Sequence, residues 1–195
     1  MGRRTDTRKR IVGAALGAMR ERGYSEMAIS DLVAEANAPR GSITFHFPGG
    51  KDEIAREVVS LRTEQILADL DAVAEASLSA GAFLDTSIDR IGAEFTESGF
   101  VAGCPVVPLV IERGAKSPDL RQLAADFFSR WRGRLEEHLV AFGIDASRAR
   151  SLATLTVSSV EGALTICRAE QSLDALIAVQ GELRTLLTIE APAAR

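Results

Sequence analysis

Apolar residues recur at spacings of three and four along most of the chain, which is the pattern of amphipathic helices. Residues 7–22 are predicted as a first helix, and Gly23 is expected to end it, because glycine readily adopts the left-handed conformation that often follows a helix. A shorter apolar stripe over 29–36 predicts a second helix. Asn37 is expected to end that helix, since asparagine tolerates the left-handed region better than most residues.

A third, short helix is predicted from Pro39 to about His46. Proline suits the first turn of a helix, and the Pro-Gly-Gly of 48–50 breaks the helix that precedes it. A helix, a tight turn and a short helix in this order have the spacing of a helix-turn-helix. Ile43 and Phe47 lie four apart and are expected to pack inward. The side chains expected on or near the outward side are those of Pro39, Arg40, Ser42, Thr44 and Phe45.

The rest of the chain continues in long helical patterns, without a convincing strand. Alanine and leucine dominate and aromatic residues make up only 5% of the chain, which also favours helices. We therefore predict an all-α fold with an N-terminal three-helix helix-turn-helix head (1–50) and a larger C-terminal helical domain (51–195). The helices expected after the head cover 51–75, 81–96, 104–114, 117–142, 145–169 and 173–189.

Charge is distributed unevenly between these two parts. The net charge is −4, but residues 1–51 carry nine Lys and Arg against five Asp and Glu, whereas residues 52–195 carry fourteen against twenty-two. A basic head on an acidic body suits a nucleic-acid partner, and a merely solvated N-terminus is the alternative. The first basic residues are candidates either for an arm that reaches DNA or for a solubilising tail: Arg3, Arg4, Arg8, Lys9 and Arg10.

Catalytic and membrane functions find little support. His46 and His138 have no neighbouring partners for catalysis or metal binding, and the Gly-Gly-Lys of 49–51 lacks the first glycine of a phosphate-binding loop. No uncharged apolar run approaches the roughly 18 residues of a membrane span. Cys104 and Cys167 lie far apart, so we expect a reduced cytoplasmic protein and leave a disulfide open. We expect a non-enzyme with neither cofactor nor metal.

The head carries the motif of a known family. Its sequence resembles the DNA-binding head of TetR-family transcriptional regulators over roughly residues 7–55, through Gly23-Tyr24, the stripe through Leu32 and Ala36, Gly41-Ser42-Ile43-Thr44-Phe45-His46-Phe47 and Lys51. The motifs Pro48-Gly49-Gly50 and Gly103-Cys104-Pro105-Val106 resemble the LmrA/YxaF-like subgroup. The departures from the family lie at four positions. The family usually has a tyrosine at Thr44, a glycine at Asn37, a β-branched residue at Ala38, and a serine or threonine at Ala28 that caps the second helix.

Several residues of the head are candidates to contact double-stranded DNA. Arginine forms bidentate hydrogen bonds with guanine in the major groove, so Arg40 is assigned to base recognition, with a phosphate contact as the alternative. Phe45 is expected either to contact a thymine methyl or sugar, or to fold back onto the first helix. The resemblance implies a phosphate contact for His46, and Lys51 at a helix start suits a phosphate too. The full set is Arg40, Ser42, Thr44, Phe45, His46 and Lys51.

The resemblance implies that the C-terminal domain binds an effector and forms a homodimer through the last two helices. The apolar side chains expected in this four-helix interface, with intrachain core as the alternative, are Leu152, Leu155, Val160, Leu164, Leu173, Leu176, Ile177, Leu183 and Leu187. Small residues are expected to allow close helix approach, namely Ala153, Ser158, Ser159, Gly162 and Ala163.

A small apolar or aromatic effector is expected to bind among residues that also suit ordinary core packing: Phe83, Phe95, Cys104, Val107, Val110, Ile111, Phe127, Phe128 and Trp131. The sequence thus favours a DNA-binding transcriptional regulator, specifically a ligand-relieved repressor that binds a near-palindromic operator as a dimer. The alternative is a helical ligand-binding module, or a thiol redox sensor built on Cys104, whose head makes protein contacts.

Overall fold

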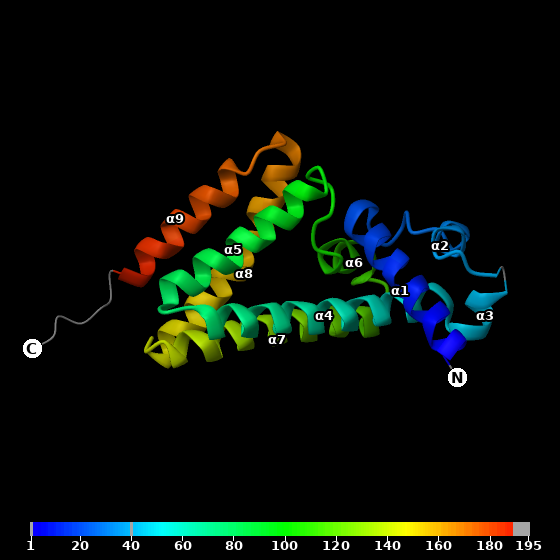
Figure 1. Cartoon of the computed structure of the whole chain (residues 1–195), viewed down its shortest axis with the longest axis horizontal. Helices are drawn as coiled ribbons and strands as arrows, with labels where there is room; N and C mark the ends of the chain where they lie inside the picture. Colours follow the sequence, from blue (N-terminus) through cyan, green and yellow to red (C-terminus); the bar gives the residue numbers. More distant parts are fainter. Residues whose placement is uncertain (1, 40, 189–195) are drawn as a thin grey trace, which may run out of the picture. The chain divides into compact units, whose positions relative to one another are not determined.

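The computed structural model describes residues 2–39 and 41–188, with side chains from residue 6 to residue 187. Within these ranges the chain is all-α, as predicted, and contains no strand (Figure 1). The helices are α1 (Gly2–Arg22), α2 (Ile29–Glu35), α3 (Ser42–His46), α4 (Gly50–Ala76), α5 (Ala80–Glu97), α6 (Val106–Arg113), α7 (Pro118–Ala141), α8 (Ala146–Glu170) and α9 (Asp174–Thr188). Over the same ranges, no helix is both long and apolar enough to cross a membrane.

The chain divides into two compact units. The head unit, as we call the first, contains the residues up to Glu64 together with Cys104–Phe127, so α6 belongs to it along with α1, α2 and α3. The body unit contains Gln65–Gly103 and the residues from Phe128 onward. The domain boundary predicted after residue 50 coincides with the start of α4 and remains a prediction.

Local signals in the sequence account for most helix ends. Gly23 follows α1 at φ +85°, and its N–H donates to the carbonyl of Met19 at 3.1 Å. Asn37 follows α2 at φ +46°, which confirms the predicted left-handed stop. The start of α8 is capped by Asp145, whose carboxylate accepts from the backbone N–H groups of Ser147 and Arg148.

The start of α3 is where the sequence prediction is wrong. The helix begins at Ser42 and not at Pro39, because the Ser42 N–H donates to the Pro39 carbonyl at 2.9 Å in a turn that precedes the helix. The side chain of Ser42 is 8% exposed, so the predicted outward placement of this residue is also wrong. Ser42 is the first residue of this five-residue helix and Ile43 the second, and both side chains are buried.

The core of the head unit forms on the predicted apolar faces. Ile11, Met19 and Leu32 are fully buried. Ile43, the second residue of α3, is 6% exposed, and Phe47, which directly follows α3, is 1% exposed. Packing of these side chains must hold α3 in place, since a helix this short has little stability of its own.

The body unit is a bundle in which α9 packs against both α5 and α8 (Figure 1). Gly92 on α5 is buried, and a Cβ at this position would lie 3.2 Å from a methyl carbon of Leu176 on α9. Arg184 on α9 donates from its Nε to the carboxylate of Asp85 on α5 at 2.9 Å. A close apolar approach and an ion pair therefore both join α5 to α9.

A polar link in the body unit joins the end of α4 to α7. The guanidinium of Arg134 and the Nε2 of His138 both contact the Asp71 carboxylate, the latter at 2.8 Å. The hydrogen bond from Arg134, followed by that from His138, lowers the pKa of Asp71 below its usual value against the opposing effect of burial. The His138 ring also packs edge-on against the fully buried ring of Phe83, with centroids 5.3 Å apart.

Replacing Ala28 with serine is expected to stabilise the chain by about 1 kcal/mol, because α2 has no side-chain cap. Ala28 already has the extended backbone of an N-cap residue, at φ −81° and ψ 134°, but its methyl side chain has no oxygen that could accept a hydrogen bond from the helix. Chemical denaturation should show the gain in the free energy of unfolding. The control is Ala34→Ser on the exposed side of the same helix, which is expected to lose about 0.5 kcal/mol. Equal changes in both variants would contradict the capping explanation.

Candidate nucleic-acid interface

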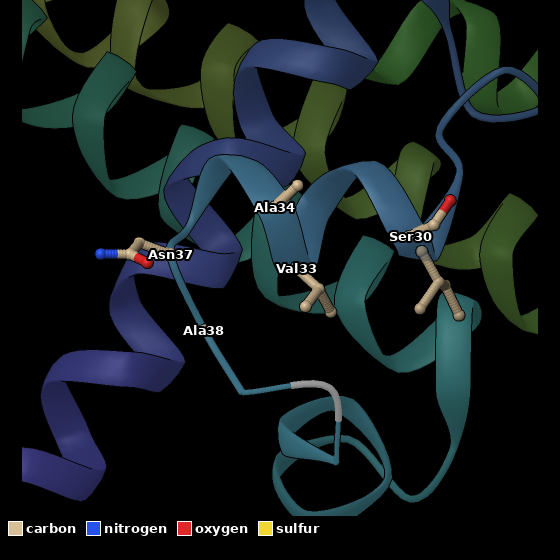
Figure 2. A pocket seen from close by; sticks show the side chains of 6 residues that line it. Ser30, Val33, Ala34, Asn37 and Ala38 are labelled. Atoms are coloured by element: carbon tan, nitrogen blue, oxygen red, sulfur yellow. The ribbon is translucent and has the colours of Figure 1, made fainter.

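A groove lies along α2, the helix that precedes α3. The groove has a volume of about 650 Å³ and is lined by Ile29, Ser30, Val33, Ala34, Asn37 and Ala38. In Figure 2, Val33 points away from the axis of α2 and Asn37 lies at the end of that helix, where the chain turns. Small and apolar side chains form most of the groove, with a hydroxyl and an amide among them. The sequence predicts only helix packing for Ile29 and Val33 and a helix end at Asn37, so it does not point to this groove.

The outward side of α3 presents Thr44 and Phe45. Both are exposed, Phe45 by 59%, so this ring is not folded into the core. The ring contacts the His46 imidazole edge-on, with centroids 4.9 Å apart. His46 is half-buried at the end of α3. Arg40 lies outside the described residues. The DNA contacts assigned to all of these side chains remain predictions.

Lys51 lies at the start of α4 and turns toward the α1–α2 connection. Its Nζ donates to the Ser25 carbonyl at 2.9 Å and lies 4.6 Å from the centre of the Tyr24 ring. Burial lowers the pKa of this ammonium below its usual value. An ammonium has three N–H donors, so a phosphate contact from Lys51 is compatible with its hydrogen bond to the Ser25 carbonyl.

Residues of α6 take part in the same polar cluster. The Glu112 carboxylate accepts from the Ser25 backbone N–H at 2.6 Å, and the Arg113 guanidinium lies 3.7 Å from the carboxylate of Asp52. The hydroxyl of Tyr24, which is 6% exposed, donates to Asp52 as well. Burial, followed by the hydrogen bond to Asp52, raises the pKa of Tyr24 to about 12, so the hydroxyl remains a donor at neutral pH.

Two basic residues predicted for a DNA arm are bound within the head unit. Arg8 contacts Glu53, Glu57 and the carbonyl of His46. Arg10 donates from its Nε to the Ala36 carbonyl at 2.9 Å and pairs with Asp6. The amino-acid composition treats both as positive charges available to DNA. The tertiary structure shows instead that both are paired with groups of the head unit. The side chains of Arg3 and Arg4 lie outside the described residues.

The residues predicted for an effector pocket fall in both compact units, so their assembly into one pocket remains a prediction. Four rings are buried, those of Phe83, Phe95, Phe127 and Trp131, while Cys104, Val107, Val110 and Phe128 are half-buried. Ile111 is 75% exposed on α6. Neither Cys104 nor Cys167 forms a disulfide, and Cys167 is fully buried. Among the described residues, no group of three or more His, Cys, Asp or Glu is placed to hold a metal ion.

The short helix α3, which follows α2 after a tight turn, has the arrangement of a helix-turn-helix, a motif of many DNA-binding proteins. Residues 11–58 match the family model of bacterial regulatory proteins of the tetR family, and residues 80–182 match that of the C-terminal domain of LmrA/YxaF-like transcriptional regulators. The chain therefore belongs to the TetR family of transcriptional regulators, with a C-terminal domain of the LmrA/YxaF-like type. This confirms both resemblances, and it places the chain in a class of regulators and not of enzymes.

Individual relatives agree with this assignment. An HTH-type transcriptional regulator of Mycobacterium tuberculosis is 35% identical over 190 residues, which cover 95% of this chain and 96% of the relative. The HTH-type transcriptional regulator LmrA of Bacillus subtilis is 27% identical, over 93% of this chain and 97% of its own. Among solved structures, a TetR transcriptional regulator from Legionella pneumophila matches with a TM-score of 0.82 at 25% identity, covering 90% of this chain and 94% of that one.

Proposed function

We propose that this chain is a cytoplasmic, ligand-relieved repressor that binds a near-palindromic operator as a homodimer. The observation that carries the proposal is an exposed stripe of small and apolar side chains along α8 and α9. In a two-fold dimer, two copies of α3 would enter successive major-groove turns about 34–36 Å apart. An operator with two related half-sites would match that symmetry.

The stripe has the spacing of one helix face. On α8 it consists of Ser151, Leu155, Ser158, Gly162 and Ile166, and α9 adds Ile177, Ala178, Gly181 and Thr185. Leu155, Ile166 and Ile177 are 44%, 49% and 58% exposed. Apolar side chains this exposed, on the same stripe as small residues of two packed helices, are typical of an interface between copies of a chain.

The glycines of the stripe support a close helix–helix contact. A Cβ built at Gly162 or at Gly181 would meet no heavy atom within 4 Å, so the packing of this chain does not require glycine at either position. Glycine in a helix costs about 1 kcal/mol relative to alanine. A partner helix that approaches closely at these points accounts for the glycines.

Several side chains predicted for the interface are core residues of one chain. Leu152, Val160, Leu164, Leu176 and Leu183 are at most 9% exposed. Ala153 and Ala163, expected to allow close helix approach, are also buried. The proposed interface therefore rests on the exposed stripe alone, which is narrower than the set predicted from the sequence.

Relief by an effector requires a difference in affinity between two conformations. A small apolar or aromatic molecule bound in the body would weaken operator binding only as far as it prefers the conformation that does not bind DNA. Of the apolar residues predicted for the effector site, Phe83, Phe95 and Trp131 belong to the body unit.

Sequence-specific and salt-dependent binding to DNA from upstream of the protein's own coding sequence tests this function. Lys51→Ala is expected to weaken binding to every duplex and to reduce the slope of log K against log salt by about 0.9, the effect of one phosphate contact.

Arg40→Ala is expected to relax preference at one base pair, by about 1–3 kcal/mol of discrimination. Gel shifts over a salt series measure both. Binding no stronger than that to random competitor DNA would refute the operator proposal, and equal losses in both variants would refute the role of Arg40.

A further inference from the structure

The side chain of Arg8 joins three helices of the head unit. From α1, its guanidinium donates to the carbonyl of His46, the last residue of α3. The Nη2 atom donates to Glu57 at 2.9 Å and lies 3.4 Å from Glu53, both on α4. The guanidinium carbon also lies 4.5 Å from the centre of the Phe47 ring. The Arg8 side chain thus contacts the last residue of α3, the Phe47 ring directly after it, and helix α4.

The contact to His46 satisfies a group that α3 cannot satisfy itself. The last carbonyls of any helix lack partners within the helix, and a cation at this end is favoured. The start of α3 has no side-chain cap, because Gly41 precedes it. A helix of five residues without a cap depends on tertiary contacts for its position, and Arg8 supplies a charged one at the opposite end.

The two glutamates hold the Arg8 guanidinium in this place. Glu53 and Glu57 lie four apart on α4 and so project from the same face of that helix. The hydrogen bond to Glu57 is the main reason that the pKa of Arg8 is raised above its usual value. These three contacts use up to three of the five guanidinium N–H groups and orient the Arg8 side chain toward α3 and α4.

We propose that Arg8 is a positioning residue, which holds the C-terminal end of the recognition helix α3 and thereby sets how well the protein distinguishes its operator from other DNA. This role rests on the proposed operator binding. It differs from the arm predicted from the sequence, in which Arg8 would bind phosphates directly. Positioning acts through the geometry of α3, so the planar fork of arginine matters and charge alone does not suffice.

The first test compares Arg8→Ala and Arg8→Lys with Lys9→Ala, which removes the same charge from the exposed neighbouring position. Two duplexes of about 30 base pairs serve as probes: one isolated by in vitro selection with the wild-type protein, and a scrambled version of it. Arg8→Ala is expected to reduce the ratio of the two affinities about tenfold, and Arg8→Lys is expected not to restore it. Lys9→Ala should leave the ratio unchanged. A ratio preserved in Arg8→Ala, or restored by Arg8→Lys, overturns the proposal in favour of a simple charge contact.

The second test needs no DNA. The Phe47 N–H donates to the Ile43 carbonyl at 2.7 Å and so reports on the last turn of α3. Hydrogen exchange at this amide is expected to become about tenfold faster in Arg8→Ala, relative to the Ala36 amide, which donates to Leu32 in α2. Unchanged exchange at Phe47 would overturn the positioning role. If in vitro selection yields no preferred duplex, the operator proposal fails, while the exchange measurement still decides whether Arg8 holds α3.

Discussion

Replacing Gly162 with arginine is expected to split the homodimer into monomers and to lower operator affinity by about 100-fold or more, because the two half-sites would then be bound independently. The exposed position of Gly162 at the centre of the α8 stripe makes this substitution harmless to the fold of one chain, since a Cβ there meets no atom within 4 Å. Between two closely packed helices, the same side chain would bring a charge and a large volume into an apolar contact. Light scattering after gel filtration measures the mass, and gel shifts measure the affinity.

A pair of smaller substitutions separates the interface from helix propensity. Gly162→Ala and Gly133→Ala both place alanine in a helix where a Cβ would have open space. In an isolated chain each would gain about 1 kcal/mol. At the proposed interface, Gly162→Ala is expected to weaken dimerisation, while Gly133→Ala on α7 leaves it unchanged. A dimer that survives Gly162→Arg, or a Gly162→Ala variant that behaves like Gly133→Ala, would show that the helices do not meet at this glycine.

Gly23→Ala is expected to lower the free energy of unfolding by about 2–4 kcal/mol, which is a large loss for a single methyl group. The left-handed conformation at φ +85° costs any residue with a Cβ about 1–2 kcal/mol. The new Cβ would also lie 2.5 Å from the Glu112 carboxylate and 3.3 Å from the Cβ of Pro108. Glu112 would have to move, and its hydrogen bond to the Ser25 N–H would weaken, at a further cost of about 1.5 kcal/mol.

Gly143→Ala supplies the matched control for this prediction. Gly143 also follows a helix with positive φ, at +91°, but a Cβ there would meet no atom within 4 Å. Its expected loss is therefore the conformational part alone, about 1–2 kcal/mol. Urea denaturation at one fixed protein concentration gives both values. Equal losses at the two glycines would mean that α6 adapts to the methyl group without cost, and adding Glu112→Ala to Gly23→Ala would then show no coupling.

The elements that the sequence predicted well are those with local signals. Helix ends at Gly23 and Asn37 follow from the backbone preferences of single residues. The inward packing of Ile43 and Phe47 follows from their helical spacing, and both are buried. The start of α3 was predicted wrongly because proline suits a turn as well as a first helical turn, and the residues around Pro39 do not distinguish the two.

The candidate site was harder to predict, because it depends on partners far away in the sequence. Arg8 contacts residues 38 to 49 positions later, and Ser25 contacts Glu112 across 87 positions. Charge counts and local motifs treat Arg8 and Lys51 as positive charges available to DNA. Which carbonyl, carboxylate or ring each one meets is a property of the packed head unit.

The sequence by itself determined the all-α class, the helix-turn-helix and the family, because apolar periodicity, helix-ending residues and a compact motif are local properties of the chain. Only the tertiary structure decided which basic side chains remain on the outside and which hold the head together. Hydrogen bonds and ion pairs between distant segments form only after burial brings them together. For that reason Arg8, first counted among the residues of a DNA arm, lies against α3 and α4.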